Sequence, residues 1–215
     1  MGMAFTRILG GGSEAPNYPE NLGKFVVADD PAGAKTVFFQ HLQVFSPKPS
    51  FGIEAQSPDR TVVWRNCGGT LIVRKSAKAF LSNCVGHLYQ EPGSVVWARQ
   101  WNTENGPEKV GINTRNDGGQ LWILGMKTEA KNTKLAVLNG GCTEVLGVHN
   151  YNTSGVKDDT PFFRVENASL AVTGYREICF SGAWWKVTTL SVQNGVESRQ
   201  GSKAWQTVPL IRAGK

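Results

Sequence analysis

The sequence repeats itself at a fixed spacing. The run VVWARQWNTE at 95–104 ends on Thr-Glu, and the run LWILGMKTE at 121–129 ends on the same pair 25 residues later (129 − 104). A fixed period in the range of about 20 to 50 residues is typical of one structural unit stacked on copies of itself. This period restricts the fold more than any other feature of the chain.

Further positions are related by the same step. The sets are Val96, Leu121 and Leu146; Ala98, Ile123 and Val148; Trp101, Met126 and Tyr151; Ile112, Val137 and Phe162; Ile72 with Trp97; and Arg74 with Arg99. Apolar residues mostly recur with apolar residues in these sets. We therefore expect ladders of like side chains that run from one unit to the next.

Within each unit, apolar and polar residues alternate over short runs bounded by NG, NDGG or NGG, a pattern typical of strands and turns. The 25 Gly and 10 Pro are spread along the chain rather than gathered in a linker. We predict an all-β solenoid, a parallel β-helix with about 25 residues per coil. One domain covers 1–215, with an irregular lead-in over 1–35 and a closing segment over 193–215.

Strand alternation assigns side chains to the two faces of the repeated strand. Val96, Leu121 and Leu146 are predicted to form one inward ladder, and Ala98, Ile123 and Val148 the next. The outward face is then expected to carry Trp97, Trp122, Arg74, Arg99 and His149.

Composition narrows the class of partner. The net charge of +6 is not gathered into a run, so no nucleic-acid partner is expected. No apolar stretch approaches the length of a membrane helix, and the first residues lack the apolar core of a secretory signal. The cysteines, which are Cys67, Cys84, Cys142 and Cys179, show no CxxC spacing. We therefore expect free thiols, no metal site and no cofactor.

The residues from 96 to 173 also resemble a known family. The run VWARQWNTEN…NDGGQLWILGMKTE…NGGCTEVLGVHNY…PFFRVENASLAVT is similar to the C-terminal β-helix of bacterial pectate-lyase-superfamily proteins, which resemble two-helix exo-β-1,3-glucanases. The segment RILGGGSEA at 7–15 is a weaker match. The resemblance implies a right-handed, single-stranded parallel β-helix, an activity on carbohydrate, and relatives that are secreted. The localisation of this chain stays open.

Glu104 and Glu129 are the candidate catalytic pair. On successive coils they are expected about 5 Å apart, and two carboxylates across a sugar carry out glycoside hydrolysis as acid and as base or nucleophile. The alternative is that both are solvated or pair with Lys127 and Lys131.

Arg74, Arg99 and Lys127 are candidates to bind the carboxylates of a uronic-acid polymer. The resemblance also implies a lyase activity, in which an arginine can act as the base, usually beside calcium ligands. The nearest aspartates, Asp117 and Asp158, fall in predicted turns, so exposed cations on a solvated sheet are the alternative.

Trp97 and Trp122, with Tyr151 near them, form a candidate platform for sugar rings. The same outward aromatic residues equally suit a surface that packs on another protein, including a second copy of this chain. An open coil end is a second place where two copies could meet. His149 lies on the predicted outward face, where it could assist proton transfer.

The sequence favours a glycoside hydrolase acting on a β-glucan-like polysaccharide. Two alternatives stay open: a carbohydrate-binding or assembly module without catalysis, and a uronic-acid lyase. The sugar, the linkage and the oligomeric state are not predicted.

Overall fold

The structure, a computed structural model, describes residues 2–3, 23–42, 51–104, 111–129, 131–153, 159–180, 182, 184–201 and 206–214. Within these ranges the regular secondary structure is strand throughout, which confirms the all-β class. No helix long and apolar enough to cross a membrane occurs among the same residues.

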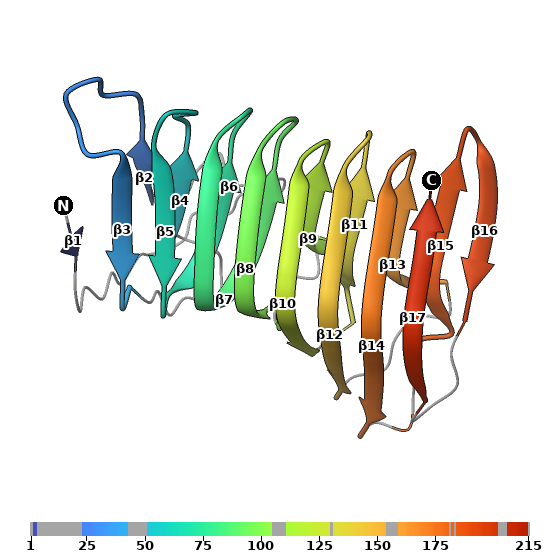
Figure 1. The fold of residues 1–215 in the computed structure, drawn as a ribbon. Helices are drawn as coiled ribbons and strands as arrows, with labels where there is room; N and C mark the ends of the chain where they lie inside the picture. The colour runs from blue at the N-terminus through green and yellow to red at the C-terminus, as the bar shows by residue number, and fades with distance from the viewer. Residues whose placement is uncertain are drawn as a thin grey trace.

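The strands join into one 17-stranded curled sheet (Figure 1). Their bounds are β1 Gly2–Met3, β2 Gly23–Val27, β3 Thr36–Gln40, β4 Phe51–Ala55, β5 Thr61–Arg65, β6 Gly68–Val73, β7 Lys78–Gln90, β8 Val95–Asn102, β9 Ile112–Asp117, β10 Gln120–Glu129, β11 Thr133–Leu138, β12 Cys142–Asn152, β13 Pro161–Glu166, β14 Ser169–Cys179, β15 Val187–Gln193, β16 Val196–Gln200 and β17 Thr207–Gly214.

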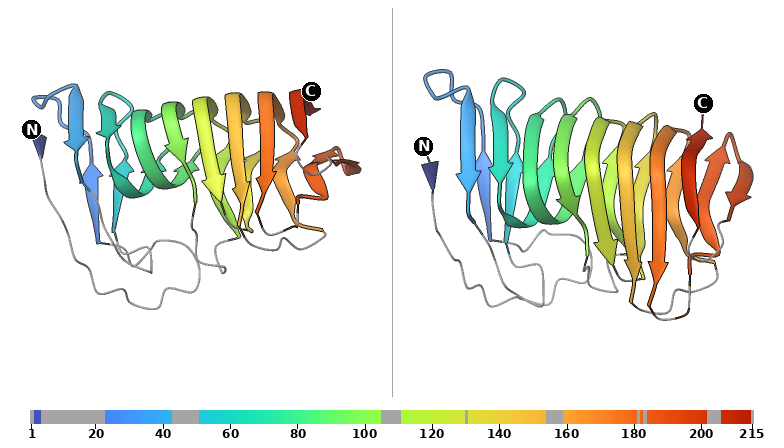
Figure 2. Two further views of the ribbon diagram at one scale, coloured as in Figure 1. Left: turned by 90° about the horizontal axis from the view of Figure 1, so that it is seen from below. Right: turned by 60° about the horizontal axis from the view of Figure 1, so that its bottom comes forward.

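Most strands pair in parallel with the strand two places further along the chain. β10 pairs with β8 and β12, and β11 pairs with β9 and β13. The chain thus alternates between two stacks of parallel strands, as in a solenoid. We call β3, β5, β8, β10, β12 and β14 the long-strand face, and β2, β4, β6, β9, β11, β13 and β15 the short-strand face; β7 belongs to both. Figure 2 shows the two faces from further directions.

Each strand of the long-strand face, β7 included, has a residue with a positive φ at one equivalent position, either within the strand or directly after it. These residues are His41, Asn66, Asn83, Gln100, Gly125, Gly147 and Gly174. They form one row: Gly125 and Gly147, for example, lie between the paired positions Leu124–Leu146 and Met126–Val148. Asparagine and glycine tolerate this left-handed conformation best. We call this row the bend ladder.

The bend ladder inverts the alternation of side chains. In β10, Ile123 is buried and Leu124 is exposed before Gly125, whereas Met126 is buried and Lys127 is partly exposed after it. A regular strand would instead bury 125 and 127 with 123. The outward face beyond the bend therefore carries Lys127, which simple alternation from Ile123 would have placed inside.

The 25-residue period holds between β8 and β10 and fails at the next coil. Leu121 lies opposite Val96, but on its other side it lies opposite Thr143, 22 residues later (143 − 121). The prediction of an inward Leu146 is wrong: it pairs with Leu124, and its side chain is 52% exposed. The reason is that the connections between strands change in length while the pairing of strand with strand continues.

The same change of coil length affects other predicted ladders. Val148 is buried, but it pairs with Met126 instead of Ile123, and Tyr151 pairs with Glu129. On the short-strand face, Ile112 pairs with Thr133 rather than Val137.

The predicted closing segment contains two antiparallel strands. β16 pairs with β15, and β17 pairs with β14. Each therefore forms the last strand of one stack. Of the lead-in and this segment, residues 1, 4–22, 202–205 and 215 lie outside the described residues.

Candidate binding groove

An aromatic column covers part of the outside of the long-strand face. Trp97 lies between Phe80 and Trp122 in register. The ring centroids of Phe80 and Trp97 are 4.5 Å apart, and those of Trp97 and Trp122 are 5.7 Å apart, with the planes within 13° and 10° of parallel. The rings therefore stack on one another along the solenoid and cover each other's faces. A sugar platform would need those faces free.

The two arginines predicted to stack lie apart. Arg74 directly follows β6 on the short-strand face, where its Nε lies 2.7 Å from Glu54 and its Nη1 2.5 Å from Glu91. The hydrogen bond to Glu54, more than the one to Glu91, raises the pKa of the Arg74 guanidinium. Arg99 lies on β8 and donates to the hydroxyl of Ser82. The predicted 25-residue step from Arg74 to Arg99 is wrong, because the coil between them is shorter.

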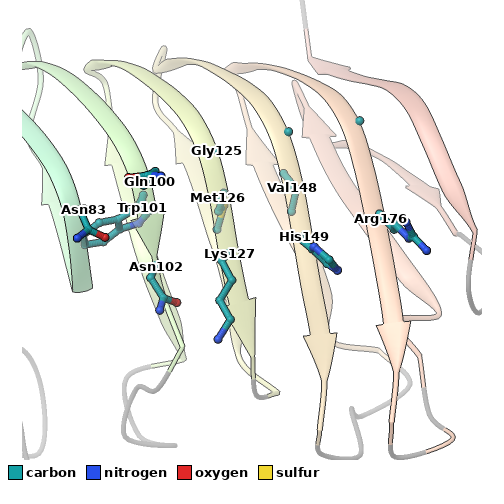
Figure 3. A pocket seen from close by; sticks show the side chains of 12 residues that line it. Asn83, Gln100, Trp101, Asn102, Gly125, Met126, Lys127, Val148, His149 and Arg176 are labelled. Atoms are coloured by element: carbon teal, nitrogen blue, oxygen red, sulfur yellow. The ribbon is translucent and has the colours of Figure 1, made fainter.

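A groove of about 610 Å³ lies on this side of the molecule (Figure 3). Its floor follows the bend ladder, and one of its walls is formed by the outward residue two positions further along each strand. The floor residues are Asn83, Gln100, Gly125, Gly147 and Gly174, and the wall residues are Asn102, Lys127, His149 and Arg176. The wall residues are in register across four neighbouring strands.

Glycine accounts for the depth of the groove over β10 and β12. A Cβ built on Gly125 or on Gly147 would meet no atom within 4 Å. The hollow is thus the space where side chains are missing on the outer side of the bend. At the β7 end, Asn83 and Gln100 fill the same row with amide side chains.

The two predicted catalytic carboxylates meet on one ammonium group. The Nζ of Lys127 contacts Oε1 of Glu104 and lies 2.5 Å from Oε1 of Glu129. Asn102 also donates to Glu104 over 2.9 Å. The structure thus brings Glu104 and Glu129 to the end of the same groove wall, and it places the Lys127 ammonium against both of them. We call these three residues the groove triad.

Aromatic rings continue this surface toward the C-terminus. His149 stacks on Tyr151 with 4.5 Å between ring centroids, and Tyr151 stacks on Phe180 with 5.9 Å. Lys127 Nζ lies 5.4 Å from the centre of the Tyr151 ring. Lys127, His149 and Tyr151 are therefore neighbours on the outward face, as are Trp97 and Trp122 earlier along the strands.

A second polar cluster lies inside the solenoid, behind the groove triad. Thr128 donates to the backbone oxygen of Thr103 over 2.8 Å, and Asn150 and Glu177 follow in register. All four side chains are buried. The repeated Thr-Glu pair thus combines an inward threonine with an outward glutamate. We call Thr103, Thr128, Asn150 and Glu177 the inner seam.

Glu177 ends the inner seam in a dense hydrogen-bond network. Its carboxylate accepts from the amides of Asn150 and Asn152, from the backbone N–H of Trp185 and from the hydroxyl of Tyr175. Burial raises the pKa of Glu177, and the hydrogen bond from Trp185 partly opposes this. Burial, with the nearby Glu177 charge, also raises the pKa of Tyr175.

Lys134 on β11 is buried completely. Its Nζ has no hydrogen-bond partner among the described residues. Burial lowers the pKa of Lys134 to about 7, while the charge of Glu129 acts in the opposite direction. The amine is therefore partly neutral at neutral pH.

Sequence reasoning missed several of these residues. Arg176, Gly147 and Gly174 were not singled out, because their place in the groove follows from coils of unequal length. Lys134 and Glu177 were missed because a charged residue in a strand is normally exposed. The signal that was available for Lys134 is its position in TKLAVL, a run that is otherwise short of charge.

No group of three His, Cys, Asp or Glu side chains in the described part of the chain could hold a metal ion. The four cysteines are free thiols. No family model, curated protein or solved structure matches this chain. The groove is therefore the feature of the molecule from which a function is inferred.

Proposed function

We propose that this chain is a polysaccharide-binding module without catalytic activity, and that it holds its ligand in the groove above the bend ladder. The observation that carries the proposal is the composition of the groove: amides, an imidazole, a guanidinium and a carboxylate-bound ammonium lie on successive strands beside a bare glycine floor. Sugar hydroxyl groups need such mixed donors and acceptors at fixed positions.

Binding is favoured over hydrolysis by the groove triad. A two-carboxylate glycosidase needs room between its carboxylates for the scissile bond, and for a water in an inverting enzyme. Lys127 occupies that position against both Glu104 and Glu129. The glycoside hydrolase favoured by the sequence stays a prediction, which release of reducing sugar would support.

The uronic-acid lyase is the least supported alternative. Arg74 is held by two carboxylates on the other face, so it does not join Arg99 and Lys127. The assembly module is supported by the outward apolar residues Phe80 and Leu124, which are 45% and 55% exposed.

We also propose the finer fold assignment, a single right-handed parallel β-helix related to the pectate-lyase superfamily. The parallel pairing of every second strand and the bend ladder support it. An experimental structure would test both the handedness and the relationship.

Gly147→Asn is the sharpest variant for the binding proposal. Gly147 has φ +85°, and Asn66 and Asn83 hold φ 51° and 53° in the same row. An asparagine therefore fits the backbone there, and its side chain would occupy the groove floor. Gly140→Asn is the matched control, since Gly140 has φ +82° and equally open space in the β11–β12 turn.

The experiment measures depletion of each protein by insoluble β-1,3-glucan, cellulose, xylan and cross-linked polygalacturonate, with reducing sugar measured in the same tubes. We expect wild type and Gly140→Asn to bind at least one polymer equally, Gly147→Asn to bind it at least about tenfold more weakly, and no sugar to be released. Equal binding by all three proteins would place the ligand elsewhere. Release of sugar that Glu104→Gln abolishes would establish the hydrolase instead.

A further inference from the structure

The groove is periodic across the strands. Each of the strands β8, β10, β12 and β14 contributes one floor residue and one wall residue, in register with those of its neighbours. β7 adds one further floor residue, Asn83. Parallel strands lie about 4.8 Å apart. The polar groups of the wall therefore recur at about this spacing, in a row that crosses the strands.

The row is not uniform along its length. Over β10, β12 and β14 the floor is glycine, and the wall passes from Lys127 through His149 to Arg176. Over β7 and β8 the floor carries the amides of Asn83 and Gln100. The groove thus has a bare section three strands long and an amide-lined section that continues it.

A ligand that contacts every strand in the same way must repeat at the same spacing. An extended saccharide chain, whose successive rings advance by about one strand spacing, brings one ring to each wall residue. A coiled chain curves away from the straight row after the first rings. A straight row also favours a rigid ligand, because less conformational entropy is lost when it binds.

We infer that the groove binds an extended, ribbon-like 1,4-β-linked saccharide, with its axis across the strands and one ring per strand over β10, β12 and β14. This inference rests on the proposed polysaccharide-binding function. The amide-lined section over β8 and β7 takes up to two further rings, with weaker contact because its floor is filled.

The test is a length series by isothermal titration calorimetry. The probes are cello-oligosaccharides of two to six rings and laminari-oligosaccharides of the same lengths, whose 1,3-β linkage produces a coiled chain. We expect the affinity for the extended series to rise at least about fivefold from two rings to three, to rise less up to five, and then to level off. The coiled series should gain little beyond two rings.

Gly147→Asn divides the bare section and should abolish the gain from the third ring, whereas Gly140→Asn should reproduce wild type. Similar length profiles for the two series would overturn the inference while leaving the proposed function intact, as would an extended series whose affinity does not change with length. If no saccharide of either series and none of the polymers binds folded protein, the proposed function itself fails.

Discussion

Lysine and glutamate occur in two opposite settings in this molecule, one on the outside of the long-strand face and one in the interior. In the groove triad, Lys127 is about one-third exposed and contacts two carboxylates. Inside, Lys134 is completely buried without a partner, and Glu177 is buried among four hydrogen-bond donors.

The comparison shows that residue type alone does not decide what a charged group does here. In the groove, water screens the charges and competes for them, so each ion pair contributes little to stability. Inside, every unsatisfied or broken contact costs the full desolvation of the group. Stability should therefore depend on the inner residues, and ligand binding on the outer ones.

The largest expected effect is on Glu177. Glu177→Ala should lower the free energy of unfolding by about 3–5 kcal/mol, because it removes the acceptor that several buried donors share, and a buried donor left unsatisfied costs about 1–3 kcal/mol. These donors are the amides of Asn150 and Asn152, the Trp185 N–H and the Tyr175 hydroxyl. Urea unfolding followed by tryptophan fluorescence would measure the loss.

Glu177→Gln is the matched variant, since it retains one acceptor oxygen in the same place. It should cost clearly less than Glu177→Ala. If both variants were as stable as wild type, the inner seam would not contribute to stability and the comparison would fail.

Lys134 should make stability depend on pH. Its pKa is about 7 in the folded chain against an ordinary value of 10.5, so the unfolded chain binds more protons between these values. Stability should therefore rise with pH from about 7 to about 10.5, by up to roughly 5 kcal/mol; below that window the amine is protonated in both states, so its destabilising effect is complete and no longer changes with pH.

Lys134→Met removes this dependence and the buried amine together. We expect the variant to exceed wild type in unfolding free energy at pH 7, and the difference to shrink as the pH rises to 10, because the pH then approaches the unfolded-state pKa and loss of the proton on folding costs little. Lys78→Met, on an exposed position of β7, is the control. A difference that does not change with pH would contradict the lowered pKa.

Much of the fold follows from the sequence because strands can be recognised from short local patterns of alternating residues. The all-β class and the stacked pair Trp97 and Trp122 needed only alternation and one correct step of 25 residues. The placement of Leu146 and Arg74 needed the lengths of the neighbouring coils, which the turns decide individually. A period counted on one coil cannot predict the next when turns differ in length.

Only part of the site was predicted, because the step of 25 residues applies to only part of the chain. Glu104, Lys127 and Glu129 lie on the first two coils of the repeat, where the step of 25 holds, and the structure brings them together. The groove beside them depends on the bend ladder, whose inversion of side-chain alternation leaves no mark in the apolar pattern. Its local sign at most of these positions is a glycine or asparagine within or directly after a strand.

The smallest effect on stability is expected in the groove triad. Glu129→Gln removes one negative charge beside Lys127, and Glu104 still holds the ammonium, so the free energy of unfolding should change by less than about 1 kcal/mol. The same substitution should nevertheless act on the interior. The charge of Glu129 raises the pKa of Lys134, so its removal should lower that pKa further.

In Glu129→Gln, stability should then begin to rise at a lower pH than in wild type. In Glu104→Gln, it should begin to rise at the same pH as in wild type. Unfolding curves recorded at half-unit pH intervals from 5 to 10 would detect the shift. A large loss of stability in Glu129→Gln would remove the distinction between groove and interior. An unshifted curve would instead mean that water screens the outer carboxylate from the buried amine, and the two settings would then be independent of each other.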